Sequence, residues 1–208
     1  MKQIILIKDG ELALKGLNRS SFEDILVKNL KYRLKSCGAC EIKKSQSTIT
    51  VEPLDDDFDF EAAKSAVSKV FGIAAFSVAA AVDKNMDKII AEGVPYLKEI
   101  LGNIKTFKVV SKRSDKKFPL DSMQISEQFG GALLGAYHNL KVDVHEPDAV
   151  VAVQIREKYA YIRCGQLKGA GGMPVGTGGR AEILISGGID SPVAAWMMAK
   201  RGIRLSAV

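Results

Sequence analysis

The chain has 208 residues, of which 47% are hydrophobic and 26% charged, a balance typical of a globular protein with one or two cored domains. It contains no run of 18 or more apolar residues, and the apolar stretch 4–7 near the N-terminus is too short for the core of a signal peptide. These features exclude a membrane-spanning protein and lead us to expect a cytoplasmic one with no membrane partner.

The cysteines argue against an exported, disulfide-bonded protein. There are three, Cys37, Cys40 and Cys164, an odd number that fits a reducing compartment. Cys37 and Cys40 have a spacing seen in redox and zinc sites, but a zinc ion needs about four ligands, and only Cys164 and two histidines remain to supply them. We interpret the pair as a turn at a helix end and expect no metal site there.

Residues 1–80 alternate between strand-like and helical patterns. In the first helix the apolar side chains recur every three or four residues, so that they share one face; they are Phe22, Ile25, Leu26, Leu30 and Leu34. Strands are expected over residues 3–8, 40–44, 47–52 and 73–80, and helices over 18–35 and 60–69. This order, βαββαβ, is that of a ferredoxin-like domain. The connecting segment 8–19 carries three cations and two acids, and either a ligand-binding surface or a solvated connection would account for it.

Residues 81–165 suggest a second, small α/β domain. We expect a helix over 86–101 that is broken near Gly93 and Pro95, a strand over 106–111, a helix over 122–139 and a strand pair over 148–155 and 158–163. The second helix contains Gly130, Gly131 and Gly135. Because each glycine inside a helix costs about 1 kcal/mol relative to alanine, we expect close packing or a close ligand at these positions.

The net charge of +6 is unevenly distributed along the chain. An acidic stretch lies at residues 55–61, whereas six cations crowd residues 105–117, which contain one acid, Asp115. The six are Lys105, Lys108, Lys112, Arg113, Lys116 and Lys117. A polyanionic partner is therefore expected at the basic cluster.

Residues 183–202 have the residue types of a specific kind of binding site. An apolar run at 183–185 enters the pair Gly187 and Gly188, and a second apolar run follows at 193–199, which indicates a strand, a tight turn and a helix. Glycines allow unusual backbone angles and a close ligand, and a helix N-terminus offers N–H groups and partial positive charge, so the turn suits phosphate. No Gly-Lys-Ser or Gly-Lys-Thr follows, so this is not the common phosphate loop.

The ends of this last helix are also marked in the sequence. Ser191 is a suitable N-cap, Pro192 is suited to the first helical position, and Gly202 follows two basic residues as a helix stop.

The hexapeptide 186–191, Ser-Gly-Gly-Ile-Asp-Ser, resembles the signature of the PP-loop ATP pyrophosphatases. The glycine-rich stretch 168–180 is similar to the passage into the catalytic domain of the tRNA 4-thiouridine synthetases, the tRNA sulfurtransferases of the thiamine biosynthesis family. This resemblance implies an α+β protein: a ferredoxin-like domain at 1–80, a THUMP RNA-binding domain at 81–165, a linker at 166–181 and the start of a doubly wound PP-loop domain at 182–208.

The activity implied by the resemblance is ATP-dependent thiolation of tRNA. A tRNA uridine is adenylated and its oxygen is replaced by persulfide sulfur from a cysteine desulfurase to give 4-thiouridine; the family also supplies sulfur for thiamine thiazole synthesis. The implied ATP site, with Mg²⁺, places Asp190 at the metal or phosphate side as the catalytic residue. Its other members are Ser186, Gly187, Gly188 and Ser191 at the phosphates, and Ile183 and Leu184 beside adenine. The implied RNA-binding residues are Lys112, Arg113, Lys116 and Lys117, with Arg163 and Lys168 as additions.

The sequence departs from the family in its extent. A doubly wound domain needs several more βα units, and the sequence stops inside the second strand of this one. We therefore expect a fragment that cannot complete catalysis alone and whose exposed apolar surface could produce a homodimer. A fragment of another PP-loop adenylating enzyme and a stand-alone RNA-binding module stay open as alternatives.

Overall fold

The computed structural model describes residues 1–45 and 48–208, and the chain forms two compact units. We name them by their order in the sequence: the central unit comprises Met1–Ile4 and Ser77–Gly165, and the flanking unit comprises Ile5–Phe76 and Gln166–Val208, which precede and follow Ser77–Gly165 along the chain. Ser47, where a strand was expected to begin, lies outside the described residues.

Residues 2–82 confirm the βαββαβ order. The elements are β1 (Lys2–Asp9), the short 3-10 helices η1 (Glu11–Leu14) and η2 (Gly16–Asn18), α1 (Arg19–Leu34), β2 (Cys40–Ser45), β3 (Thr48–Pro53), α2 (Phe60–Ser68) and β4 (Ile73–Val82). Strand β3 runs antiparallel to both β1 and β2. Helix α1 buries Leu26, Leu30 and Leu34, whereas Phe22 and Ile25, expected on the same face, are only half-buried.

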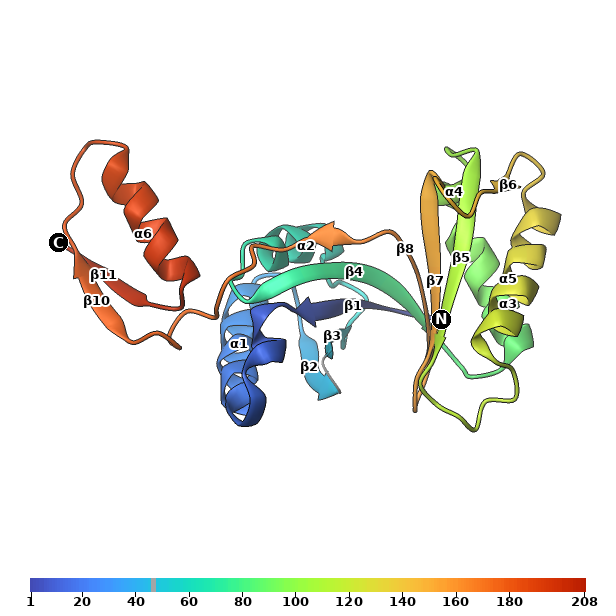
Figure 1. Ribbon diagram of the computed structural model, residues 1–208, viewed down its shortest axis with the longest axis horizontal. Helices are drawn as coiled ribbons and strands as arrows, with labels where there is room; N and C mark the ends of the chain where they lie inside the picture. Colours follow the sequence, from blue (N-terminus) through green and yellow to red (C-terminus); the bar gives the residue numbers. More distant parts are fainter. Residues whose placement is uncertain (46–47) are drawn as a thin grey trace. The chain divides into compact units, whose positions relative to one another are not determined.

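The central unit is a sheet with helices on one side. Its elements are the second half of β4, α3 (Met86–Tyr96), α4 (Lys98–Leu101), β5 (Thr106–Arg113), α5 (Ser122–Ala136), β6 (Lys141–Val142), β7 (Ala149–Ile155) and β8 (Ala160–Cys164). The strand order is β4-β8-β7-β5-β6, with β5 parallel to β7 and β8 antiparallel to both β7 and β4. Figure 1 shows α3 and α5 on the same side of β5 and β7.

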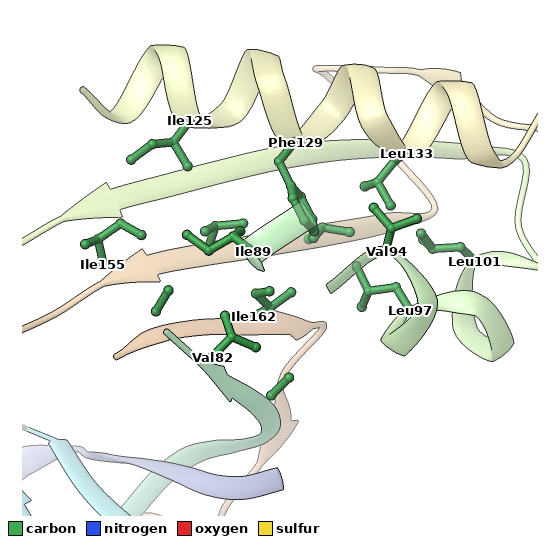
Figure 2. Packing of buried hydrophobic residues seen from close by; sticks show 14 of the residues in the cluster. Val82, Ile89, Val94, Leu97, Leu101, Ile125, Phe129, Leu133, Ile155 and Ile162 are labelled. Atoms are coloured by element: carbon green, nitrogen blue, oxygen red, sulfur yellow. The ribbon is translucent and has the colours of Figure 1, made fainter. Parts of the chain in front are cut away.

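A single apolar cluster joins these helices to the sheet. Figure 2 shows Ile125, Phe129 and Leu133 of α5 pointing toward the strands, where they meet a buried layer that includes Ile155 and Ile162. The three α5 residues are spaced by four, so one helix face enters the core. A capping box between Asp121 and Gln124 begins α5 and satisfies two backbone N–H groups.

The glycines of the central helices have different roles. The break expected near Gly93 and Pro95 occurs at Leu97, between α3 and α4. A Cβ at Gly93 would lie less than 3.0 Å from Ile162, so this glycine lets α3 approach the sheet closely.

Helix α5 ends at Ala136, three residues before the expected end. A Cβ at Gly130 would lie 3.6 Å from Val109, whereas at Gly131 and Gly135 it would meet no atom within 4 Å. Because 3.6 Å is an ordinary van der Waals distance, a side chain would fit at all three positions, and the expectation of close packing at these glycines is wrong.

The C-terminal part of the flanking unit is a βαβ segment. After β9 (Leu167–Lys168), which pairs with β4, the chain forms β10 (Arg180–Ile183), α6 (Asp190–Lys200) and β11 (Arg204–Ala207). Strands β10 and β11 are parallel neighbours, drawn in orange and red in Figure 1. This connection is the repeating unit of a doubly wound fold.

Two expected boundaries in this segment are wrong. The strand expected over 183–185 covers 180–183, and α6 begins at Asp190 with Ile189 at its N-cap, so Ser191 is not the cap and Pro192 is not the first helical residue. The physical reason is that the Ser191 hydroxyl accepts the N–H of Ser186 across the turn. Gly202, with φ of 91°, ends the helix as expected.

Candidate phosphate loop and nucleic-acid interface

The turn at 186–191 brings the two predicted serines together. The Ser186 N–H donates to the Ser191 hydroxyl at 3.1 Å, and the two hydroxyl oxygens lie 3.4 Å apart. The Gly188 N–H points to the Ser186 hydroxyl at 3.4 Å. The loop between β10 and α6 is therefore shaped by its own polar groups, which can also serve an anion.

Gly187 and Gly188 leave the main chain of this loop open. A Cβ at Gly187 would meet no atom within 4 Å, and at Gly188 it would meet only the Ser186 hydroxyl, at 3.6 Å. Neither glycine has a φ in the left-handed region, so the unusual backbone angles that glycine allows are not adopted at these two positions. Their contribution is open space in which a ligand can approach the backbone.

The other predicted ATP residues flank this loop. Asp190 occupies the first turn of α6, where the helix dipole favours a carboxylate. Ile183 is half-buried at the end of β10, and Leu184 beside it is 79% exposed. Hydroxyl and N–H donors at a helix N-terminus suit phosphate oxygens, and an adjacent carboxylate suits Mg²⁺, so the donor set fits the groups expected here.

The glycine-rich stretch holds this βαβ segment by backbone contacts. The Met173 N–H donates to the Lys200 carbonyl at 2.8 Å, and the N–H groups of Gly176 and Gly178 share the Gly202 carbonyl at 2.7 and 2.9 Å. Gly171 exchanges backbone bonds with the start of β4, where the Gly72 N–H donates to it at 2.8 Å. Residues 171–178 therefore connect the βαβ segment to the start of β4 within the flanking unit, and we call them the clasp. Glycine content alone did not indicate this role.

The basic cluster is divided between two faces of the central sheet. Lys112 at the end of β5 and Lys116 and Lys117 in the following loop are exposed. Arg113 points the other way, since its guanidinium donates to the carbonyls of Phe118 and Leu120 at 3.1 and 3.4 Å. The three lysines are therefore exposed at the end of β5 and in the loop that follows it, whereas Arg113 holds that loop in shape.

The one acid of the cluster is already paired. The Lys84 ammonium lies 2.5 Å from Asp115, and the Lys117 N–H donates to the same carboxylate at 2.9 Å. The Lys84 hydrogen bond, followed by that backbone bond, lowers the pKa of Asp115. Asp115 therefore does not cancel the charge of the exposed lysines.

Strand register places Arg163 with Lys112. Lys112 is opposite Gln154 and Arg163 is opposite Ala152, and Ala152 and Gln154 lie on the same face of β7 because they are two residues apart. The Arg163 guanidinium donates to the Gly165 carbonyl at 2.9 Å. Lys112 and Arg163 thus belong to one surface, on the sheet face opposite the apolar core.

Lys168 lies in the flanking unit. It is on β9, at a cavity of about 390 Å³ that Lys64, Ser65, Ser68 and Leu167 also line.

The charged segment 8–19 is fixed by ion pairs. Arg19 contacts Asp9 at 2.7 Å and Glu23 at 2.6 Å. Burial raises the pKa of the Asp9 carboxyl, against the opposing effect of Arg19. This network favours a structural role for Arg19.

The three cysteines are free thiols. Across residues 1–45 and 48–208 no group of three or more metal-ligating side chains is assembled. Within that same part of the chain, no helix combines the length and apolar character needed to cross a membrane.

Known families match consecutive parts of the chain. The ThiI ferredoxin-like domain matches residues 4–77, the THUMP domain matches residues 83–164, and the thiamine biosynthesis protein (ThiI) family matches residues 176–208. A probable tRNA sulfurtransferase of Caldanaerobacter subterraneus is 49% identical over the whole chain, and one of Acetivibrio thermocellus is 45% identical. The chain thus corresponds to the N-terminal part of the ThiI tRNA sulfurtransferases, namely the ferredoxin-like domain, the THUMP domain and the start of the ThiI domain.

Solved structures agree with this similarity to the N-terminal part of the tRNA sulfurtransferases. A 4-thiouridine synthetase crystallised as an RNA complex with bound ATP matches 100% of this chain and 52% of its own, with a TM-score of 0.88 and 32% identity. The protein PH1313 of Pyrococcus horikoshii matches 99% of this chain and 67% of its own, with a TM-score of 0.86 and 29% identity. The chain spans about half the length, 53%, of each of the two curated relatives.

Proposed function

We propose that this chain is the tRNA-binding half of an ATP-dependent tRNA sulfurtransferase that converts a uridine to 4-thiouridine, and that it contributes the first part of the ATP site. The observation that carries the proposal is the similarity of the whole chain to the 4-thiouridine synthetase solved with RNA and ATP. A cytoplasmic location, a cysteine desulfurase as sulfur donor and a contribution to thiamine synthesis belong to the same proposal.

On the RNA side, Lys112, Lys116 and Lys117 neutralise phosphates and position the tRNA, since they are exposed and their one acidic neighbour is paired with Lys84. Arg163 extends this surface across the sheet. Lys168 contributes a further cation from the flanking unit, and Arg113 acts indirectly through the loop that it holds.

On the ATP side, the bound nucleotide supplies the adenylyl group that activates the uridine oxygen for replacement by sulfur. The hydroxyls of Ser186 and Ser191 and the main chain at Gly187 and Gly188 donate hydrogen bonds to phosphate oxygens. Asp190 holds Mg²⁺ beside them. Ile183 and Leu184 provide apolar contact for the adenine ring at the end of β10.

The proposal is tested by joining this chain to the C-terminal remainder of the Caldanaerobacter subterraneus relative and measuring 4-thiouridine formation in tRNA with ATP and a persulfide source. We expect activity, and we expect Asp190→Asn to reduce it about 100-fold, the usual scale for losing an electrostatic catalytic group. Asp87→Asn is the matched control, because Asp87 also lies in the first turn of a helix. Equal effects of the two substitutions would refute the role of Asp190. Tight tRNA binding without thiolation would support the alternative that the chain is an RNA-binding module.

A further inference from the structure

The face of the central sheet that carries Lys112 and Arg163 also carries aromatic side chains. Tyr159, Tyr161 and Arg163 alternate along the chain with Ala160 and Ile162, which are buried in the core. The tyrosines and Arg163 therefore point away from α3 and α5. On the same face Val110 is 45% exposed and Val150 is 40% exposed, so the surface combines cations with accessible apolar area.

Tyr159 is at the tip of the β7–β8 hairpin, where Glu157 and Lys158 form the connection. The Arg156 N–H donates to the Tyr159 carbonyl at 3.0 Å and closes the hairpin. The rings of Tyr159 and Tyr161 meet edge to face, with centroids 6.4 Å apart and planes at 69°. Tyr161, only 7% exposed, thus forms a fixed support against which the half-buried Tyr159 ring is held.

A long charged side chain, that of Lys158, lies over the Tyr159 ring. The Lys158 ammonium lies 5.3 Å from the ring centroid, and Lys158 itself is exposed. A lysine over an aromatic face contributes about 0.5–1 kcal/mol at an exposed site, whereas a stacked base contributes about 1–3 kcal/mol. A base can therefore displace the ammonium from the ring and leave it free for a phosphate.

Positive charge lies beside both tyrosine rings, with Lys158 over Tyr159 and Arg156 over Tyr161. The Arg156 guanidinium lies 5.6 Å from the centroid of Tyr161. Burial, and then the nearby charge of Arg156, lower the pKa of Arg163. Two neighbouring guanidinium groups repel each other, and an anion placed between them offsets that repulsion.

We propose that Tyr159 is a stacking platform for one unpaired base of the bound RNA, with Arg156, Arg163 and Lys112 on the same sheet face contacting the flanking phosphates. The proposal rests on the proposed function and names a part of the interface that the loop lysines do not cover. RNA is favoured over an acidic protein because aromatic faces and guanidinium groups together fit a base and its phosphates. The stretch 156–163 contains three cations and two tyrosines.

The test measures binding of an unmodified tRNA transcript to three variants, Tyr159→Ala, Tyr159→Leu and Tyr159→Phe, across a salt series. Leucine keeps an apolar contact with Tyr161 but has no aromatic face, and phenylalanine keeps both. We expect alanine and leucine to weaken binding about 5- to 100-fold, the equivalent of one stacked base, and phenylalanine to bind within about twofold of the wild type. Because no charge is removed, the slope of log affinity against log salt stays unchanged.

Two controls complete the test. Tyr32→Ala removes a tyrosine that is 79% exposed on α1 and should leave tRNA binding unchanged. A blunt RNA duplex has no unpaired base, so the Tyr159 variants should bind it as well as the wild type does. Thermal unfolding of each variant, followed by circular dichroism, separates loss of stacking from loss of the fold.

The outcomes separate this inference from the proposed function. If the wild type binds tRNA and the leucine variant binds equally well, or if phenylalanine is as weak as alanine, the stacking platform is refuted while tRNA binding stands. If the wild type does not bind tRNA, the proposed function fails first.

Discussion

The clasp that holds the βαβ segment can be tested at Gly172. Gly172 has a φ of 71°, and a Cβ there would lie less than 3.0 Å from the Lys200 carbonyl oxygen, which accepts the Met173 N–H at 2.8 Å. In Gly172→Ala the positive φ costs about 1–2 kcal/mol. Displacing Lys200 loses a hydrogen bond worth about 1 kcal/mol. We expect the segment to be destabilised by about 2–3 kcal/mol.

Gly179→Ala provides the matched control. Gly179 also has a positive φ, of 88°, but a Cβ there would meet no atom within 4 Å. This variant should lose only the conformational part, about 1–2 kcal/mol. The difference between the two variants isolates the close approach to the Lys200 carbonyl.

Trp196 reports on the segment directly. It is the one tryptophan in the sequence, lies on α6, and packs edge to face on Phe71 with ring centroids 5.6 Å apart. Urea titration followed by tryptophan fluorescence therefore measures release of α6 from the rest of the flanking unit. Equal midpoints for the Gly172 and Gly179 variants would refute the clasp.

Two further predictions concern the central unit. Gly93→Ala places a Cβ less than 3.0 Å from Ile162 and should destabilise the unit by about 1–3 kcal/mol in urea unfolding. Gly131→Ala, at a position where a Cβ meets no atom within 4 Å, should instead stabilise it by about 0.5–1 kcal/mol. A Gly93→Ala variant as stable as the wild type would contradict the close approach of α3 to the sheet. The backbone N–H groups of Thr106 and Lys105 lower the pKa of Asp148, so its contribution to stability is complete above the unfolded-state pKa of about 3.9 and is lost as the pH falls through the lower folded-state value. Unfolding midpoints of wild type and Asp148→Asn should therefore differ at pH 7 and converge on acidification, and a constant difference down to pH 2 would contradict this.

The sequence was informative where local patterns and the fold agree. The spacing of Leu26, Leu30 and Leu34 predicted the buried face of α1, and the alternation in the first 80 residues predicted the ferredoxin-like order. Gly202 was correctly predicted to end α6, because a left-handed residue after a helix is a local requirement.

Features that depend on partners distant in sequence were missed. The start of α6 was misplaced because the Ser191 hydroxyl bonds to Ser186 across the turn. The glycine-rich stretch was interpreted as a linker, although Gly172 is glycine because the Lys200 carbonyl lies against it. Composition shows that the stretch is rich in glycine, but only the folded structure shows that the Lys200 carbonyl oxygen lies too close to Gly172 for a Cβ atom.

The candidate RNA surface was also predicted only in part from the sequence. Charge density identified the loop lysines, but it also included Arg113, whose guanidinium is bound to the Phe118 and Leu120 carbonyls. The surface that joins Lys112 to Arg163 follows from the β5–β7–β8 register. No single strand reveals that register, because it is fixed by pairing between strands distant in sequence.

The central claim, that this chain binds tRNA through its exposed loop lysines, is tested most directly by filter binding of an unmodified tRNA across a salt series. The test variant changes Lys112, Lys116 and Lys117 together to alanine. The control changes Lys28, Lys31 and Lys35, three exposed lysines on or next to α1, and so removes the same charge. We predict that the test variant binds more weakly and that its slope of log affinity against log salt is shallower by about 2 to 3, as expected for three lost phosphate contacts. Wild-type slopes in both variants, or equal flattening in both, would contradict the claim.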